Sequence, residues 1–235
     1  MQNRHLVIGL GEVGSSLFRV LREHYDVEGI DSKSSVDGAF GVIHACLPYS
    51  KRFQTILEDY LKLYADNEAL VIIHSTVPLG VTEGIEGAVH SPVRGVHPQL
   101  DKGIKEFVKF FGGARAEEAA ALFEAIGIET LCTKNPRNTE AMKMWSTTYY
   151  GWNIIFQKLV QEYCEEHGLD PNFVYKESNL TYNEGYQELG RGNVVRPVLD
   201  HVPGGIGGHC VIPNCRLLES EVSRIILEQN NRFVG

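Results

Sequence analysis

Hydrophobic residues in the first half of the chain gather in short runs that alternate with amphipathic stretches. The runs LVIGLG and ALVIIHS hold almost no polar position, as expected for strands covered on both faces of a sheet. This alternation predicts βαβ units and a parallel sheet. The expected strands are His5–Gly9, Asp26–Asp31, Phe40–Leu47, Leu70–Ser75, Arg94–His97, Phe107–Gly112 and Glu129–Thr133, and the expected helices are Ser15–Tyr25, Lys51–Tyr64 and Ala116–Ile126.

The second half has a different pattern. No proline and no break appear between Pro136 and Gly168, which predicts one long helix. Bulky residues recur along it at spacings of four and three, forming an aromatic stripe of Trp145, Tyr149, Trp152, Phe156, Leu159 and Tyr163. The stripe could pack against the first half of the chain. It also fits a subunit interface, and we therefore expect a homodimer.

The rest of the second half predicts a small, mostly helical domain. A helical stretch follows Pro171, a segment rich in glycine and proline runs from Gly190 to Pro213, and a last helix covers Arg216–Asn230. The predicted fold class is α/β: a Rossmann-like doubly wound parallel sheet in residues 1–135, followed by a long helix and a small, mostly helical domain in residues 136–235.

Composition narrows the classes of function. The chain has 235 residues, 22 Lys and Arg against 30 Asp and Glu, and a net charge of −8, with no basic stripe for nucleic acid. It shows no apolar run of roughly 20 residues and no signal peptide, so we expect no membrane partner. Five scattered cysteines without a CxxC pair predict a cytoplasmic protein with no metal site.

The first glycine-rich turn is Gly9-Leu10-Gly11-Glu12-Val13-Gly14, between a predicted strand and a predicted helix. In such a turn the first glycine allows the tight bend, the second lets a pyrophosphate approach, and the third allows close helix packing. Asp31 ends the second predicted strand, where a carboxylate accepts hydrogen bonds from ribose hydroxyls and repels a 2′-phosphate. We therefore expect NAD rather than NADP, although the nearby Lys33 softens this preference. A glycine turn without a dinucleotide is the alternative.

Two further strand ends fit a cofactor site. Cys46-Leu47-Pro48 and Ser75-Thr76-Val77-Pro78 place small polar groups at the carboxyl ends of strands, where open α/β sheets bind ligands. Pro48, Ser75 and Thr76 are therefore predicted to contact the cofactor. Cys46 is interpreted as a small buried residue rather than a nucleophile.

A second glycine-rich segment, PGGIGGHCVIP, spans Pro203–Pro213. Four glycines within five residues indicate a backbone with unusual angles or a close approach to a ligand. Cys210 follows them and could gain thiolate character there, although an inert thiol is the alternative. Gly207, Gly208 and His209 are predicted to bind substrate.

These motifs resemble the UDP-glucose/GDP-mannose dehydrogenase family, especially its UDP-N-acetylmannosamine dehydrogenase members. The resemblance rests on the cysteine segment with Arg196-Pro197 and His201, on Gly9–Gly14, on Ser75-Thr76-Val77-Pro78 with Gly80 and Thr82, and on Glu140-x-x-Lys143. It implies oxidation of a sugar alcohol to an acid with NAD, through a thiohemiacetal on Cys210. It further implies that Lys143 stabilises the oxyanion, that Thr76 lies near the nicotinamide, and that Arg196 contacts substrate. A solvated Lys143 paired with Glu140 is the other interpretation.

The chain also departs from the family. Thr147 and Asn214 stand where the family has an asparagine and an aspartate, which removes the obvious general base. The His97-Pro98 pair at the end of a predicted strand resembles the prephenate dehydrogenase group. His97 is therefore a candidate substrate contact. Only 25 residues follow Cys210, so we expect a relative without the family's C-terminal domain. The alternatives are a two-electron dehydrogenase of hydroxy acids or prephenate, and a dinucleotide-binding protein without catalysis. We therefore expect a small-molecule substrate, either a sugar nucleotide or a hydroxy acid.

Overall fold

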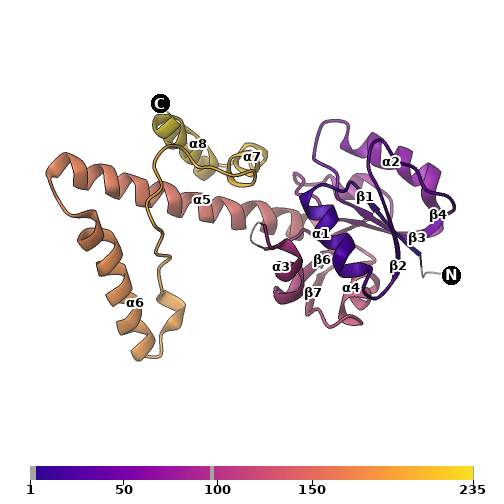
Figure 1. Cartoon of the computed structure of the whole chain (residues 1–235), viewed down its shortest axis with the longest axis horizontal. Helices are drawn as coiled ribbons and strands as arrows, with labels where there is room; N and C mark the ends of the chain where they lie inside the picture. Colours follow the sequence, from indigo (N-terminus) through magenta and orange to yellow (C-terminus); the bar gives the residue numbers. More distant parts are fainter. Residues whose placement is uncertain (1–3, 96–97, 235) are drawn as a thin grey trace. The chain divides into compact units, whose positions relative to one another are not determined.

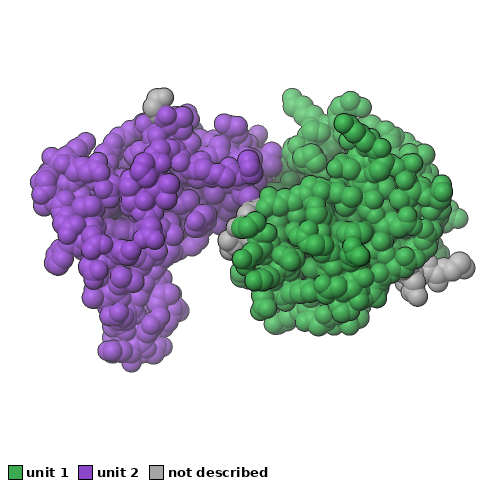
Figure 2. Space-filling model, in the orientation of Figure 1, with its two compact units in different colours: residues 1–143 green, residues 144–235 purple. Residues whose placement is uncertain are grey.

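The computed structural model describes residues 4–95 and 98–234 (Figure 1). The chain divides into two compact units, Met1–Lys143 and Met144–Gly235 (Figure 2). The boundary falls inside one long helix, α5 (Pro136–His167).

The first unit is built on a seven-stranded sheet with the order β2-β1-β3-β4-β5-β6-β7. All neighbouring strands are parallel except β5 and β6, which pair antiparallel through His90 and Gly112. The predicted α/β class is therefore confirmed, with one antiparallel pair that the sequence pattern did not indicate. The strands are β1 (Arg4–Ile8), β2 (Asp26–Ile30), β3 (Phe40–Ala45), β4 (Ala65–Ile73), β5 (Val89–His90), β6 (Lys109–Gly112) and β7 (Thr130–Thr133).

Helices cover both faces of this sheet, as a doubly wound fold requires. The helices are α1 (Glu12–Leu21), α2 (Phe53–Tyr64), α3 (Leu100–Glu106) and α4 (Ala116–Glu124), with a short 3₁₀ turn η1 (Thr82–Gly84). Leu17 of α1 and Phe123 of α4 belong to the core on one face, together with Ile104 of α3. Phe53 and Leu57 of α2 fill the core on the opposite face.

The strand predicted at Arg94–His97 is wrong over its described residues. Arg94 and Gly95 are not in a strand, and β5 lies earlier, at Val89–His90. The reason is a close backbone approach: a Cβ on Gly103 of α3 would lie 2.6 Å from the Cα of Gly95, which has φ +153°. The hydrophobic pattern predicts neither this contact nor α3.

The second unit contains most of α5, followed by short helices. They are a π-helical turn η2 (Asn172–Glu177), α6 (Ser178–Glu188), a 3₁₀ turn η3 (Gly192–Val194), α7 (Val211–Leu217) and α8 (Glu221–Val234). Ile155 of α5, Val211 and Cys215 of α7 and Ile226 of α8 form its buried core. The long helix agrees with the sequence pattern.

The single last helix predicted at Arg216–Asn230 is wrong. The chain forms α7 and α8 instead, separated by Leu218–Ser220, and Ser220 Oγ accepts the N–H of Ser223 at 3.1 Å to cap α8. Helix α7 also begins before the predicted end of the glycine- and proline-rich segment. Pro213 lies in its first turn, where proline removes no intrahelical hydrogen bond.

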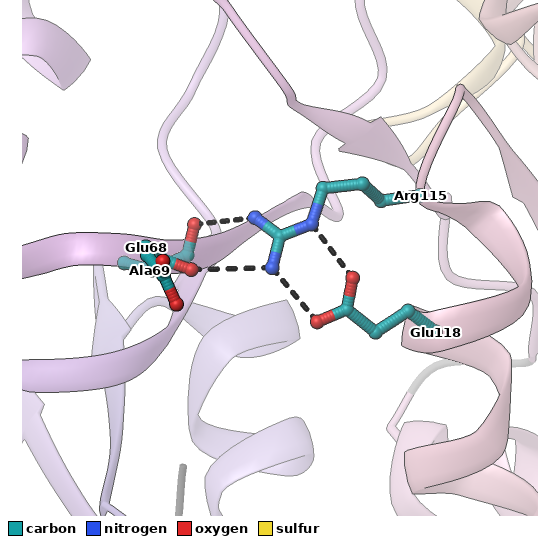
Figure 3. A network of polar contacts seen from close by, with 4 residues as sticks. All are labelled: Glu68, Ala69, Arg115 and Glu118. Atoms are coloured by element: carbon teal, nitrogen blue, oxygen red, sulfur yellow. Dashed lines mark hydrogen bonds and ion pairs between the residues drawn. The ribbon is translucent and has the colours of Figure 1, made fainter. Parts of the chain in front are cut away.

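Arg115 ties the start of α4 to β4 (Figure 3). Its guanidinium donates to the carbonyls of Ala69 at 2.8 Å and Glu68 at 3.2 Å. It also forms a bidentate ion pair with the carboxylate of Glu118, with both N–O distances at 2.7 Å. Both carbonyls lie in the stretch of β4 between Ala65 and Leu70, where its pairing with β3 shifts register. Arg115 therefore occupies main-chain acceptors beside an irregular part of the sheet.

A chain of buried histidines crosses the centre of the sheet. His5 Nδ1 lies 3.0 Å from His44 Nε2, His44 Nδ1 lies 3.0 Å from His74 Nε2, and His74 Nδ1 lies 2.8 Å from the carbonyl oxygen of Ser91. Because that carbonyl only accepts, a consistent network has each Nδ1 carrying the proton and each ring donating to the next. His5, His44 and His74 are at most 2% exposed.

Burial keeps this chain neutral. It lowers the pKa of His5 to about 4, and it lowers the pKa values of His44 and His74 well below their ordinary value. Lys109 lies 3.3 Å from His74 Nδ1, and burial lowers its pKa to about 7. His90, which contacts Thr139 Oγ1 at 2.8 Å, also has its pKa lowered to about 4 by burial.

Candidate active site

The first glycine-rich turn has the geometry that the sequence predicts. Gly9 has φ +88°, and a Cβ there would lie 2.8 Å from the carbonyl oxygen of Cys46. A Cβ on Gly14 would lie 1.8 Å from the carbonyl oxygen of Gly9, whereas a Cβ on Gly11 would meet nothing within 4 Å. Gly11 is also the N-cap of α1 and provides no capping side chain. The turn is therefore packed at Gly9 and Gly14 and open at Gly11, where the first-turn amides of α1 need acceptors.

Asp31 follows β2 directly and is exposed. Its Oδ1 accepts the N–H of Ser32 at 2.8 Å, and its own N–H donates to Ser34 Oγ at 2.8 Å. The contact with Ser32 leaves acceptor positions on the carboxylate oxygens for further hydrogen bonds. Such a carboxylate can bind the ribose hydroxyls of a dinucleotide.

The predicted cofactor contacts after β3 and β4 differ in exposure. Pro48 is exposed and Thr76 is half-buried. Ser75 is buried and donates from its hydroxyl to the carbonyl of Leu47 at 2.5 Å, so it links the two strand ends. Cys46 is half-buried, and desolvation raises the pKa of its thiol to about 12, which disfavours a thiolate nucleophile there.

Glu140 anchors the first turn of α5 to the segment after β4. The carboxylate is fully buried, and its two oxygens accept the N–H groups of Gly80 at 2.6 Å and Thr82 at 2.9 Å. One helical turn later, Lys143 donates from Nζ to the carbonyl of Val93 at 2.8 Å. From the sequence, Glu140 is part of the Glu140-x-x-Lys143 motif and, in the other interpretation, the partner of a solvated Lys143. Its position three residues before Lys143 was the available signal, but the pattern does not show that it binds backbone amides.

In the second unit, Cys210 is half-buried and is the N-cap of α7. The exposed residues Gly207, Gly208 and His209 precede it, and Gly208 has φ +79°. A Cβ on Gly207 or Gly208 would meet nothing within 4 Å. These three residues therefore form an accessible stretch of backbone directly before the thiol.

The two residues that depart from the family pattern contact each other. Asn214 is buried in α7, and its Nδ2 donates to Thr147 Oγ1 on α5 at 3.2 Å. An amide cannot take up a proton at neutral pH, so this pair holds two helices together but provides no general base.

Arg196, another predicted substrate contact, packs against an aromatic ring within the second unit. The guanidinium carbon of Arg196 lies 3.5 Å from the centre of the Tyr182 ring, and its backbone is held by Asn183 through hydrogen bonds of 2.7 and 2.8 Å. His97 lies outside the described residues. Neither within residues 4–95 nor within 98–234 do three or more His, Cys, Asp and Glu side chains form a group that could hold a metal ion. No described helix is both long and apolar enough to cross a bilayer.

Comparison with known proteins bears on the motifs. No protein-family model matches the chain. The curated UDP-N-acetyl-D-mannosamine dehydrogenase of Methanocaldococcus jannaschii is 26% identical over 64% of this chain and 35% of its own length. The resemblance seen in the motifs is confirmed. The chain is similar to a nucleotide-sugar dehydrogenase, and the match spans about a third of that relative.

Solved structures share the fold. A UDP-D-ManNAc dehydrogenase from Pyrococcus horikoshii matches with a TM-score of 0.79 and 20% identity, over 98% of this chain and 68% of that chain. The 3-hydroxyisobutyrate dehydrogenase of Mycobacterium tuberculosis matches with a TM-score of 0.70 and 15% identity, over 99% of this chain and 94% of that chain. At these identities the likeness shows the fold that both groups of dehydrogenases share.

Proposed function

We propose that the chain is a cytoplasmic NAD-dependent oxidoreductase that oxidises the CH–OH group of a nucleotide sugar through the thiol of Cys210. The observation that carries this proposal is the glycine-rich segment before Cys210, which leaves open backbone next to a half-buried thiol. The relative in Methanocaldococcus jannaschii supports the substrate class. The scattered cysteines support a reducing compartment.

The residues of the first unit fit NAD. Gly11 leaves space above the amides of the first turn of α1, which suits a pyrophosphate, and Asp31 has acceptors for the adenosine ribose. Pro48, Ser75 and Thr76 follow the neighbouring strands at the same edge of the sheet. When bound there, NAD would accept a hydride from the substrate carbon.

The role proposed for Cys210 follows from the chemistry of aldehydes. An aldehyde loses hydride readily only after a nucleophile has made its carbon tetrahedral. Cys210 would form a C–S bond to that carbon as the π bond of the aldehyde carbonyl breaks, which gives a thiohemiacetal. Transfer of its hydride to a second NAD would then leave a thioester. Water cleaves the C–S bond, releasing the acid and the thiol. Lys143, at the first-unit end of α5, is proposed to stabilise the negative oxygen.

The decisive assay is NADH formation with UDP-N-acetylmannosamine, UDP-glucose and 3-hydroxyisobutyrate. The proposal expects two NAD reduced for each sugar nucleotide oxidised to an acid. A specific observation favours a second candidate: the hydroxyisobutyrate dehydrogenase fold matches over 94% of its chain. One NAD reduced for each hydroxy acid would establish that two-electron reaction instead. Tight NAD binding without turnover on any of the three would indicate a non-catalytic binding protein.

Two glycine substitutions separate cofactor binding from folding. Gly14→Ala is expected to lower the free energy of unfolding by about 3 kcal/mol, because its Cβ would overlap the carbonyl oxygen of Gly9. Gly11→Ala has room for its methyl group and is expected to cost at most about 1 kcal/mol, yet to weaken NAD binding at least about tenfold. Urea unfolding and calorimetric titration with NAD measure the two effects. If Gly11→Ala binds NAD with wild-type affinity, the glycine turn is not part of the NAD site.

We also propose a homodimer built on the aromatic stripe. Tyr149, Phe156 and Tyr163 are 60%, 52% and 54% exposed in the chain, far more than core residues. Phe156→Glu is expected to convert the dimer to a monomer at about 10 μM in sedimentation experiments, since a buried unpaired charge is costly at an interface. Leu189→Glu, at another exposed apolar position, is the matched control. A monomeric wild-type chain at that concentration would contradict the dimer.

A further inference from the structure

Lys158 is a buried cation that the proposed reaction does not use. It lies in the middle of α5 and is 2% exposed. Burying an ammonium group is costly unless its protons are bound by acceptors. Here the acceptors are main-chain carbonyls of the glycine-rich segment: Nζ donates to Val202 and, at 2.8 Å, to Gly204. The ammonium also lies 5.6 Å from the centre of the Phe233 ring.

Helix α8 holds the next part of the same segment. Asn230 is 6% exposed, and its Oδ1 accepts the N–H of Ile206 at 2.6 Å. A Cβ on Gly205 would lie 2.6 Å from a methyl group of Val234 and 3.2 Å from Asn230 Oδ1, so a side chain at this position would require the side chains of α8 to shift. Contacts from two helices therefore fix the backbone of residues 202–206.

The three residues between this fixed backbone and Cys210 are accessible. Residues 207–209 are exposed, and Cys210 is the N-cap of α7, whose Val211 and Cys215 are buried in the unit's core. The open stretch before Cys210 is thus held at both ends, by Lys158 and Asn230 on one side and by α7 on the other. Loss of either polar anchor would allow this stretch to sample other conformations.

We propose that Lys158, together with Asn230, is a positioning residue that sets the conformation of the segment before Cys210 and so controls access to its thiol. The positioning role of Lys158 does not require the proposed function to be correct. Only its effect on catalysis rests on that proposed function. Lys158 acts through the backbone and touches no reacting atom. A long side chain with three donors suits two carbonyls that a shorter neutral residue would not reach.

The test measures alkylation of each cysteine by iodoacetamide in the full chain, resolved by peptide mass spectrometry. In Lys158→Met, the rate at Cys210 relative to the exposed Cys132 is expected to rise about fivefold, because the freed segment exposes the half-buried thiol more often. The buried Cys164 and Cys215 report unfolding of the unit and should stay protected. Lys176→Met is the matched control, since Lys176 is an exposed lysine paired with Asp200.

An unchanged ratio of Cys210 to Cys132 in a folded Lys158→Met chain would overturn the proposal. If that variant also exposes Cys164 and Cys215, Asn230→Ser removes the second anchor more mildly and must raise the same ratio. NAD affinity should remain at its wild-type value in both variants, because the glycine turn lies in the first unit. The alkylation ratio needs no turnover, so a wild-type chain without dehydrogenase activity would refute the proposed function and leave this inference standing.

Discussion

Cys210→Ala is expected to lower the rate of acid formation from a nucleotide sugar by at least about 10³-fold, because no thiohemiacetal can form. The binding of NAD should be unchanged, since the proposed cofactor contacts lie in the first unit. Any remaining NADH formation should stop after one equivalent, with free aldehyde as product. Stopped assays that quantify NADH, aldehyde and acid together measure all three consequences.

Cys215→Ala provides the matched control for that variant. Cys215 lies five residues later, is buried in α7, and contacts Thr148 Oγ1 at 3.9 Å. Its replacement should lower stability without changing the ratio of acid to aldehyde. Wild-type acid formation by Cys210→Ala would exclude covalent catalysis at this position and favour the two-electron reaction.

The first unit is expected to lose most of its stability between pH 6.5 and pH 4. The pKa values of His5 and His90 fall to about 4 in the fold, while unfolded histidine titrates near 6.5. In this window the histidines of the unfolded state bind protons, whereas those of the folded state stay neutral. The free energy of unfolding therefore decreases as pH falls. Each of the two histidines contributes about 3 kcal/mol to that loss. His44 and His74 shift in the same direction, and a domain has only about 5–15 kcal/mol in total.

The neighbouring charged groups are part of this pH dependence. Asp26 opposes the lowering of the His5 pKa, whereas Lys109 lowers the pKa values of His44 and His74 further. Lys109 itself has a pKa of about 7 in the fold, so it makes stability rise with pH between about 7 and its ordinary value of 10.5. Stability of the first unit is therefore expected to increase from acid to mildly alkaline pH.

Urea unfolding across pH 7.5 to 4.5, followed by hydrogen exchange of β3 peptides, measures this effect. His5→Phe should reduce the slope of the free energy of unfolding by about 1.4 kcal/mol per pH unit, since one proton fewer is taken up. His24→Gln is the control, because His24 is an exposed histidine of the same unit. If the protection of the β3 amides from hydrogen exchange does not change between pH 7 and pH 5, the buried histidines are not held neutral as expected here.

Much of the fold follows from the hydrophobic pattern. Continuous apolar runs mark β1, β3 and β4 because these strands are covered on both faces, and the unbroken run after Pro136 marks α5. The pattern failed around Arg94 and Gly95, where a close contact with Gly103 decides the backbone path. Such a contact depends on residues from another element and leaves no period in the sequence.

The candidate site was predictable where a single residue type is required by local geometry. Gly9 and Gly14 are such positions, because the backbone angle or the packing distance excludes a side chain. The roles of Glu140 and Lys158 were not predictable, since a glutamate and a lysine on a helix are ordinarily exposed. Both bind backbone groups far away along the chain, and only the folded structure brings these groups within reach.

The first turn of α5 has a practical consequence for dissecting the protein. Thr139 and Glu140 supply the partners of the buried His90 ring and of the Gly80 and Thr82 amides. A fragment cut at the sequence-predicted boundary after residue 135 would leave all three without these partners. A recombinant cofactor-binding fragment should therefore extend at least through Lys143, so that it includes this helical turn together with the sheet.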